Sequence, residues 1–141
     1  MRSRILVLGQ FTCIALLLFG GPWAMPWWAW SLFAVGLGVF GWAVASLGGN
    51  NFTILPDPRE GNTLAVHGIY RYVRHPMYTA VLVCGLAFTL GAPTLLRSLA
   101  LVTCAVVLVL KVRHEEALLT ARHPDYPQRM HGVARLVPGV W

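Results

Sequence analysis

Four long apolar runs constrain this chain more than any other feature of its sequence. They cover about residues 5–21, 27–47, 77–92 and 95–112. A membrane's hydrocarbon core of about 30 Å is crossed by roughly 20 helical residues, which is close to the length of these runs. The short connection GPWAMPWW, with two helix-breaking prolines, separates the first two runs. The sequence therefore predicts an all-α integral membrane fold with four transmembrane helices.

The composition supports this prediction and bounds the size of the fold. Hydrophobic residues make up 57% of the 141 residues and charged residues only 11%, whereas soluble domains contain about 25% charged residues. So few charges cannot cover a surface that faces water. The length suits a single domain, so residues 1–141 are predicted to form one unit.

The basic residues predict how the chain lies in the membrane. Of eleven Lys and Arg residues, Arg97 alone falls at the turn between the third and fourth runs. The other ten, with all five acids and all five histidines, lie before the first run, between the second and third, or towards the C-terminus. With four spans these regions share one side, which the positive-inside rule makes cytoplasmic. We therefore expect a multi-pass protein with both termini in the cytoplasm.

Several other readings of the sequence are less favourable. The basic residues form no continuous stripe, so nucleic-acid binding is not expected. The histidines show no ligand spacing and the three cysteines lie inside apolar runs, so no metal site is expected. The segment GLGVFG, 36–41, has the letters of a dinucleotide fingerprint but lies within an apolar run. We expect its small residues, with Ala34, Gly38, Gly41 and Ala45 on one face, to pack against another helix.

The segment GIYRYVRHPMY, 68–78, crowds polar and aromatic side chains at the start of the third run. Tyrosine and arginine often anchor the end of a membrane helix. Three tyrosines, three arginine or histidine side chains and a proline exceed what anchoring needs, so this segment is the first candidate for a functional site.

The second candidate is KVRHEEALLTARH, 111–123, which continues the fourth run as a helix leaving the membrane. Taken alone, it reads as a solvated helix with Lys111–Glu115 and Arg113–Glu116 pairs, each contributing about 0.2–0.5 kcal/mol. Adjacent glutamates point about 100° apart on a helix. One of Glu115 and Glu116 could therefore pair with an arginine while the other faces a cationic ligand.

These segments, with DYPQRMHGVARLVPGVW at the C-terminus, resemble the integral membrane methyltransferases over residues 56–141. That group includes isoprenylcysteine carboxyl methyltransferase and the phospholipid N-methyltransferases. The resemblance implies S-adenosylmethionine bound at the cytoplasmic face between residues 68–78 and 111–138, without a Rossmann domain, and S-adenosylhomocysteine as product.

The resemblance also assigns roles to residues by position. It implies catalytic roles for Arg74 and Glu116, and cofactor contacts for Tyr70, His75, Pro76, Tyr78, Glu115, Tyr126 and Arg135. These residue types suit the ligand independently of any resemblance. Arginine can bind its carboxylate in two places, glutamate can pair with its ammonium, and aromatic rings can accept its adenine and sulfonium.

The acceptor stays open between two chemistries. A prenylated cysteine carboxylate, the acceptor we expect, is already ionised and needs only Arg74 to orient it. A lipid amine must lose a proton, which Glu116 or His75 would take. In both cases a lipophilic acceptor would come from the membrane. A non-catalytic membrane module that binds a partner or lipid headgroup is the alternative of another class. We expect the loop 50–67 to cover the site.

Overall fold

The computed structural model describes residues 2–47, 64–139 and 141, and within them it is helical, with a single isolated β-bridge. Residues 50–63 of the loop expected to cover the site lie outside the described residues. The elements are α1 (Arg2–Phe19), α2 (Trp27–Leu47), the 3₁₀ helix η1 (Gly68–Arg71), α3 (Pro76–Gly91), α4 (Leu95–Arg122) and the short α5 (Tyr126–Arg129). The four predicted helices are present, and α4 continues ten residues beyond the predicted end of its apolar run.

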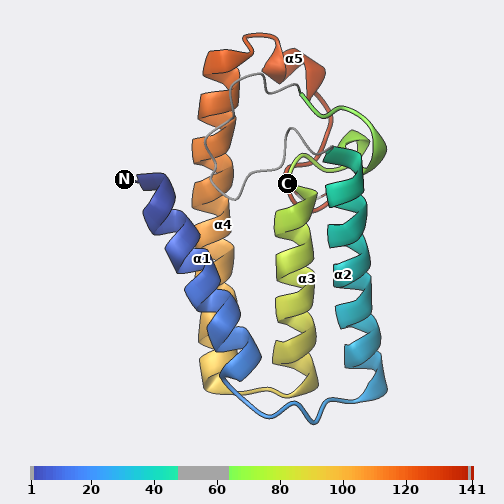
Figure 1. The fold of residues 1–141 in the computed structure, drawn as a ribbon, viewed down its shortest axis with the longest axis vertical. Helices are drawn as coiled ribbons and strands as arrows, with labels where there is room; N and C mark the ends of the chain where they lie inside the picture. Colours follow the sequence, from blue (N-terminus) through green and yellow to red (C-terminus); the bar gives the residue numbers. More distant parts are fainter. Residues whose placement is uncertain (1, 48–63, 140) are drawn as a thin grey trace.

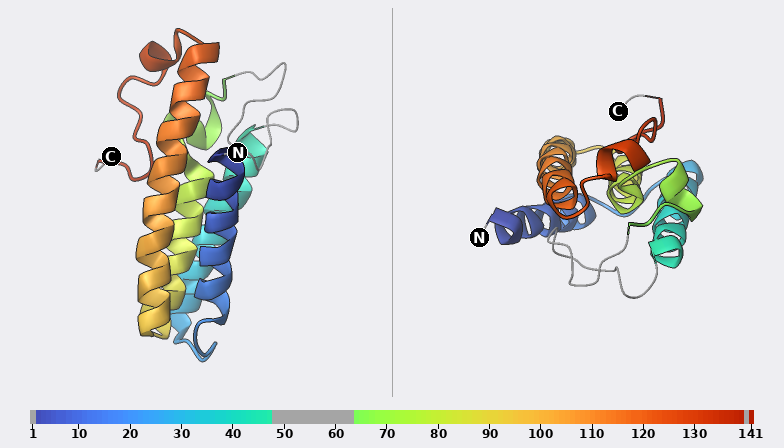
Figure 2. Two further views of the ribbon diagram at one scale, coloured as in Figure 1. Left: turned by 90° about the vertical axis from the view of Figure 1, so that its left-hand side faces the viewer. Right: turned by 90° about the horizontal axis from the view of Figure 1, so that it is seen from above.

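The four long helices lie side by side in an elongated bundle (Figures 1 and 2). Helix α3 packs against α1, α2 and α4, and α1 also packs along α4. The α1–α2 and α3–α4 connections lie at one end of the bundle (Figure 1). The start of α1, the end of α2, the start of α3 and the C-terminal part of α4 lie towards the other end. The predicted gathering of these segments on one side of the four helices is therefore present in the fold.

Two of the described helices, α2 and α4, are long and apolar enough to cross a membrane. Helix α1, counted over Ser3–Phe19, and α3, over Pro76–Gly91, are apolar but shorter. All four helices place large apolar side chains on the outside of the bundle, among them Phe11, Val35, Leu86 and Val106. A surface of this kind suits contact with lipid.

The expected packing face of α2 is wrong. Gly38 and Gly41 face open space, and Ala34 and Ala45 are exposed. Gly36 instead meets α3, where an added Cβ would lie 2.5 Å from the Cys84 sulfur. Ala29 and Ala43, seven residues before and after Gly36, are buried on the same face. Small residues occur all round this helix, so the spacing in the sequence did not single out the face that packs.

Arg97 closes the end of the bundle that carries the short connections. Its side chain is fully buried, and its three nitrogens donate hydrogen bonds to six backbone carbonyls at 2.9–3.4 Å. These carbonyls belong to Leu17, Leu18, Gly21, Pro22, Phe88 and Ala92. Carbonyls at helix ends lack intrahelical partners, so one guanidinium satisfies the ends of both α1 and α3. Thr94 caps α4 beside it by accepting from the Arg97 amide at 3.1 Å.

Candidate functional site

Backbone hydrogen bonds hold the first polar segment, residues 68–78, against the C-terminal segment, residues 130–139. The Arg74 amide donates to the Ala134 carbonyl at 2.8 Å, and the His75 amide donates to the Arg135 carbonyl at 3.1 Å. Val73 and Ala134 form a parallel bridge. Pro76 then begins α3, because its fixed φ and missing N–H suit the first helical turn. This pairing directs the Arg74 and His75 side chains towards α4.

Arg74 braces the C-terminal segment to α4. Its Nε donates to the Val133 carbonyl at 2.9 Å, one terminal nitrogen donates to the Met130 carbonyl at 2.7 Å, and the other donates to Glu116 Oε1 at 3.1 Å. Arg74 is separated from Glu116 by 42 positions in the sequence. The two segments singled out in the sequence therefore meet at this contact.

Glu116 lies between two arginines. Its second oxygen accepts a hydrogen bond from Arg135 Nε at 2.8 Å, and its side chain is only 13% exposed. Burial opposes ionisation, but the neighbouring His75 and Arg135 outweigh burial and lower the pKa of the Glu116 carboxyl group to about 2. Glu116 is therefore ionised at physiological pH, and its charge is committed to partners within the protein.

His75 lies between the two glutamates. Its Nδ1 is 3.6 Å from Glu115 Oε2 and its Nε2 is 3.6 Å from Glu116 Oε1. The Nε2 atom is buried and has no hydrogen-bond partner among the residues that the structure describes. The ring stacks on Tyr78 with centroids 5.5 Å apart, and the Tyr78 hydroxyl donates to Glu115 at 2.8 Å. Glu115 is 26% exposed, twice the value for Glu116, so it is the more accessible carboxylate.

The polar cluster is formed by the five ionisable side chains of Arg74, His75, Glu115, Glu116 and Arg135. The remaining tyrosines predicted for the site flank it. Tyr70 is buried in η1, where it packs with Ala43 of α2, and burial with the charge of Glu115 raises its pKa. Tyr126 begins α5 and is also buried, and burial with the charge of Glu116 raises its pKa. Both phenols are therefore neutral at physiological pH. Seen from above, α5 and the segment after it lie across the ends of α3 and α4 (Figure 2).

Three polar residues that support the site, Thr79, Lys111 and Gln10, were not predicted from the sequence. Thr79 donates to the Leu136 carbonyl at 2.6 Å and so fixes the C-terminal segment on α3. Lys111 was expected on a solvated helix, but it is only 2% exposed and its ammonium donates to Gln10 of α1 at 2.5 Å. The sequence could have indicated the contact between Lys111 and Gln10, because both lie inside apolar runs and polar groups at such positions need partners.

Comparison with known protein families places this chain in one of them. A sequence model of the phospholipid methyltransferase family matches residues 24–125, which include α2, α3, α4 and both polar segments. The chain belongs to the phospholipid methyltransferase family. A search of curated proteins found no match.

Family membership gives the polar cluster its chemical context. The family's description is that of a phospholipid methyltransferase, and a methyltransferase needs a methyl donor. The match stops short of α1 and of the segment that carries Tyr126 and Arg135. These parts must be understood from their contacts in this chain. Among the described residues, no group of three or more His, Cys, Asp or Glu side chains could hold a metal ion.

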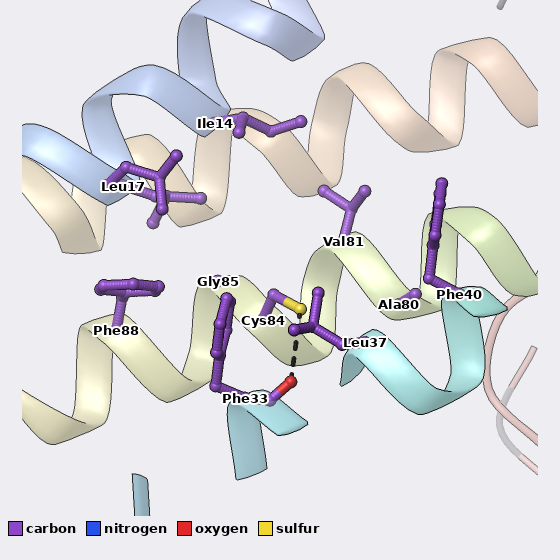
Figure 3. Close-up of a pocket in the computed structure, with 11 residues that line it drawn as sticks. Ile14, Leu17, Phe33, Leu37, Phe40, Ala80, Val81, Cys84, Gly85 and Phe88 are labelled. Carbon is purple, nitrogen blue, oxygen red and sulfur yellow. Dashed lines mark hydrogen bonds between the residues drawn. The ribbon is translucent and has the colours of Figure 1, made fainter. Parts of the chain in front are cut away.

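An apolar cavity of about 270 Å³ lies between α1, α2 and α3 (Figure 3). Leu17 and Phe88 line it in the half nearer to Arg97, and Phe40, Ala80 and Val81 line the half nearer to the polar cluster. The whole wall is apolar. Val81 is only three residues beyond Tyr78 on α3, so about one helical turn separates the cavity from the polar cluster.

Proposed function

We propose that this chain transfers a methyl group from S-adenosylmethionine to a lipophilic acceptor at the membrane surface. The observation that carries the proposal is the meeting of Arg74, His75 and Arg135 with Glu115 and Glu116 inside and beside a phospholipid methyltransferase domain. The domain so proposed comprises residues 1–141, with its site built from residues 68–78 and 111–138.

The groups present suit an amino-acid sulfonium ligand. Glu115, which pairs with no arginine in the described part of the chain, would take the ligand's ammonium. Arg135 is 40% exposed and uses Nε for Glu116, so its terminal nitrogens can bind a carboxylate in two places. Arg74 is less suited to that task because all three of its nitrogens already donate within the protein. We therefore assign Arg74 and Glu116 to holding the site together.

The aromatic groups would complete this binding site. The Tyr78 ring already contacts His75 and Lys111, so Tyr78 would act through its hydroxyl on Glu115. Tyr126 supplies a ring face beside Glu116, and the Trp141 ring lies 5.2 Å from the Arg135 guanidinium. Such faces attract an adenine or a sulfonium cation. When bound, the donor would supply an electrophilic methyl group. The chain's own residues would hold it, exclude water and bring the acceptor into line, which is where most of the catalysis of a methyl transfer lies.

An amine of a phospholipid headgroup is the acceptor that the site suits best. Such an amine must lose a proton before it can attack. His75 Nε2 is buried and makes no hydrogen bond within residues 2–47, 64–139 and 141, and it lies beside ionised Glu116, which would stabilise an imidazolium after proton uptake. Glu116 itself is the poorer base because both of its oxygens are already held by Arg74 and Arg135.

A prenylcysteine carboxylate is the second candidate acceptor. The exposed guanidinium of Arg135 favours it, because a cation is needed to orient a carboxylate. The same guanidinium would also serve the donor's carboxylate. Two anions would then depend on one arginine, which makes this candidate the weaker one.

The acceptor's hydrocarbon chain would lie in the apolar cavity between α1, α2 and α3. The cavity is wholly apolar, and its nearer half begins about one helical turn from Tyr78. An amine or carboxylate headgroup at the polar cluster can therefore reach the cavity with its chain.

Radiolabelled methyl transfer tests both acceptors. Purified protein in detergent would receive labelled S-adenosylmethionine with either phosphatidylethanolamine or a farnesylcysteine analogue. We expect label in the amine lipid, and a loss of about 10²-fold in His75→Asn, as for removal of a general base. His123→Asn is the matched control, because His123 lies in a second R-H-P-x-Y segment.

The outcomes of this assay separate the candidates. If only the farnesylcysteine analogue is labelled, the acceptor is a carboxylate and the proposed amine acceptor is wrong. Equal loss in His75→Asn and His123→Asn would remove the proposed base. Label in neither acceptor would contradict both named acceptor classes.

A further inference from the structure

A buried lysine lies directly beneath the polar cluster. Lys111 of α4 donates to the Gln10 side chain of α1 at 2.5 Å. Gln10 is itself buried, 9% exposed, within the apolar sequence of α1. The family match does not include α1. This contact therefore joins a helix outside the matched domain to the site.

The lysine ammonium also faces an aromatic ring of the site. Its Nζ lies 4.8 Å from the centre of the Tyr78 ring, within the range of a cation–π contact. The same ring stacks on His75 and carries the hydroxyl that donates to Glu115. An unbroken series of contacts thus runs from Gln10 through Lys111 and Tyr78 to Glu115.

A cation in this position is a costly way to fill space. Burying an ammonium among apolar helices is unfavourable, and one amide oxygen with one ring face compensates only in part. A leucine or methionine would fill the same volume without that cost. The charge therefore does something that volume alone would not do.

We propose that Lys111, held by Gln10, is a positioning residue of the methyl-donor site. The ammonium fixes the face of Tyr78, and this fixes the hydroxyl on Glu115 and the ring on His75. The ammonium also lies one helical turn before Glu115, the carboxylate that would pair with the donor's ammonium. This inference rests on the proposed function and extends the site to α1.

Calorimetric titration with S-adenosylhomocysteine in detergent tests the inference through binding alone. Lys111→Met should weaken binding about tenfold, because it removes the cation–π contact and with it the fixed position of the Tyr78 ring and hydroxyl. Lys111→Arg keeps a cation and should restore most of the affinity. With S-adenosylmethionine, Lys111→Met should raise the donor KM more than it lowers kcat.

Arg97→Met is the matched control, because it removes the other buried cation of α4 at the opposite end of the bundle. It should lower the unfolding temperature and leave the affinity of the folded protein unchanged. Gln10→Leu keeps Lys111 and removes only its hydrogen-bond partner, so it should weaken binding even if Lys111→Met does not fold.

The results distinguish this inference from the proposed function. Wild-type protein that binds no S-adenosylhomocysteine would contradict the proposed function. Wild-type binding that Lys111→Met and Gln10→Leu leave intact would overturn the inference alone. A loss in Lys111→Met that Lys111→Arg does not reduce would also overturn it, because the charge would then not be the cause.

Discussion

Glu116 connects separate parts of the polar cluster through two ion pairs. One oxygen pairs with Arg74 of the first polar segment and the other with Arg135 of the C-terminal segment. Each of these arginines comes from a different part of the chain. When one partner of a buried ion pair is removed, the remaining uncompensated charge costs several kcal/mol of folding free energy. Glu116 therefore fixes three segments relative to one another.

The pKa of Glu116 predicts a specific loss of stability in acid. Because its folded-state pKa of about 2 lies below its usual value of 4.5, ionised Glu116 stabilises the fold at and above about pH 4.5. That contribution should fall away as the pH drops from about 4.5 towards 2. Thermal unfolding of the wild type in detergent, followed across this range, should show the loss.

Glu116→Gln is the control for this measurement. The variant should be less stable than the wild type at pH 7, and its unfolding temperature should change less between pH 4.5 and 2. Parallel curves for the two proteins would contradict the assigned ion pairs.

The sequence predicted the meeting of these residues better than it predicted their individual contacts. The glutamate pair and the R-H-P-M-Y segment carry distinctive side chains, so the resemblance could locate them. Arg74, in contrast, was expected to orient a substrate, whereas two of its nitrogens bind the Met130 and Val133 carbonyls. Backbone acceptors exist at every position, so no sequence pattern could identify these two.

At the scale of the elements, α3 connects the polar cluster to the apolar cavity. Its first turn carries Pro76 and Tyr78, and its next turns supply Ala80, Val81, Gly85 and Phe88 to the cavity wall. The bounds of α3 and α2 followed from the apolar runs and their flanking prolines. The packing face of α2 did not, because Gly36 and Gly38 differ only in which helix side they occupy.

A larger side chain in the cavity wall should weaken binding of the acceptor and leave binding of the donor unchanged. Val81→Phe adds volume to the wall, so it should raise the KM for a long-chain acceptor while S-adenosylhomocysteine binds as in the wild type. Methyl-transfer kinetics with acceptors of different chain length measure this effect. Overpacking costs about 1–3 kcal/mol, so the unfolding temperature must be measured in parallel.

Val106→Phe on α4 is the matched substitution, because Val106 is exposed on the outside of the bundle. It should leave the acceptor KM unchanged. Equal effects of Val81→Phe and Val106→Phe, or a raised KM for short and long acceptors alike, would contradict a chain in the cavity.

At the scale of the whole molecule, the two ends of the bundle have opposite characters. Arg97 is enclosed by backbone carbonyls at one end, so its charge is not available to a ligand. The ionised side chains of the polar cluster lie at the other end, between α3, α4 and the C-terminal segment. The distribution of charges along the sequence predicted this polarity, since nearly all of them lie outside the α1–α2 and α3–α4 connections.

The central claim is that the polar cluster binds the amino-acid part shared by S-adenosylmethionine and S-adenosylhomocysteine, and calorimetric titration with S-adenosylhomocysteine tests it most directly. We expect saturable binding to the wild type, weakened at least about tenfold in Glu115→Gln and in Arg135→Met, since each loses a charged partner of the ligand. Arg129→Met, whose arginine pairs with Asp125 on the exposed surface, should bind as the wild type does. Absence of saturable binding, or equal affinities in all four proteins, would contradict the claim.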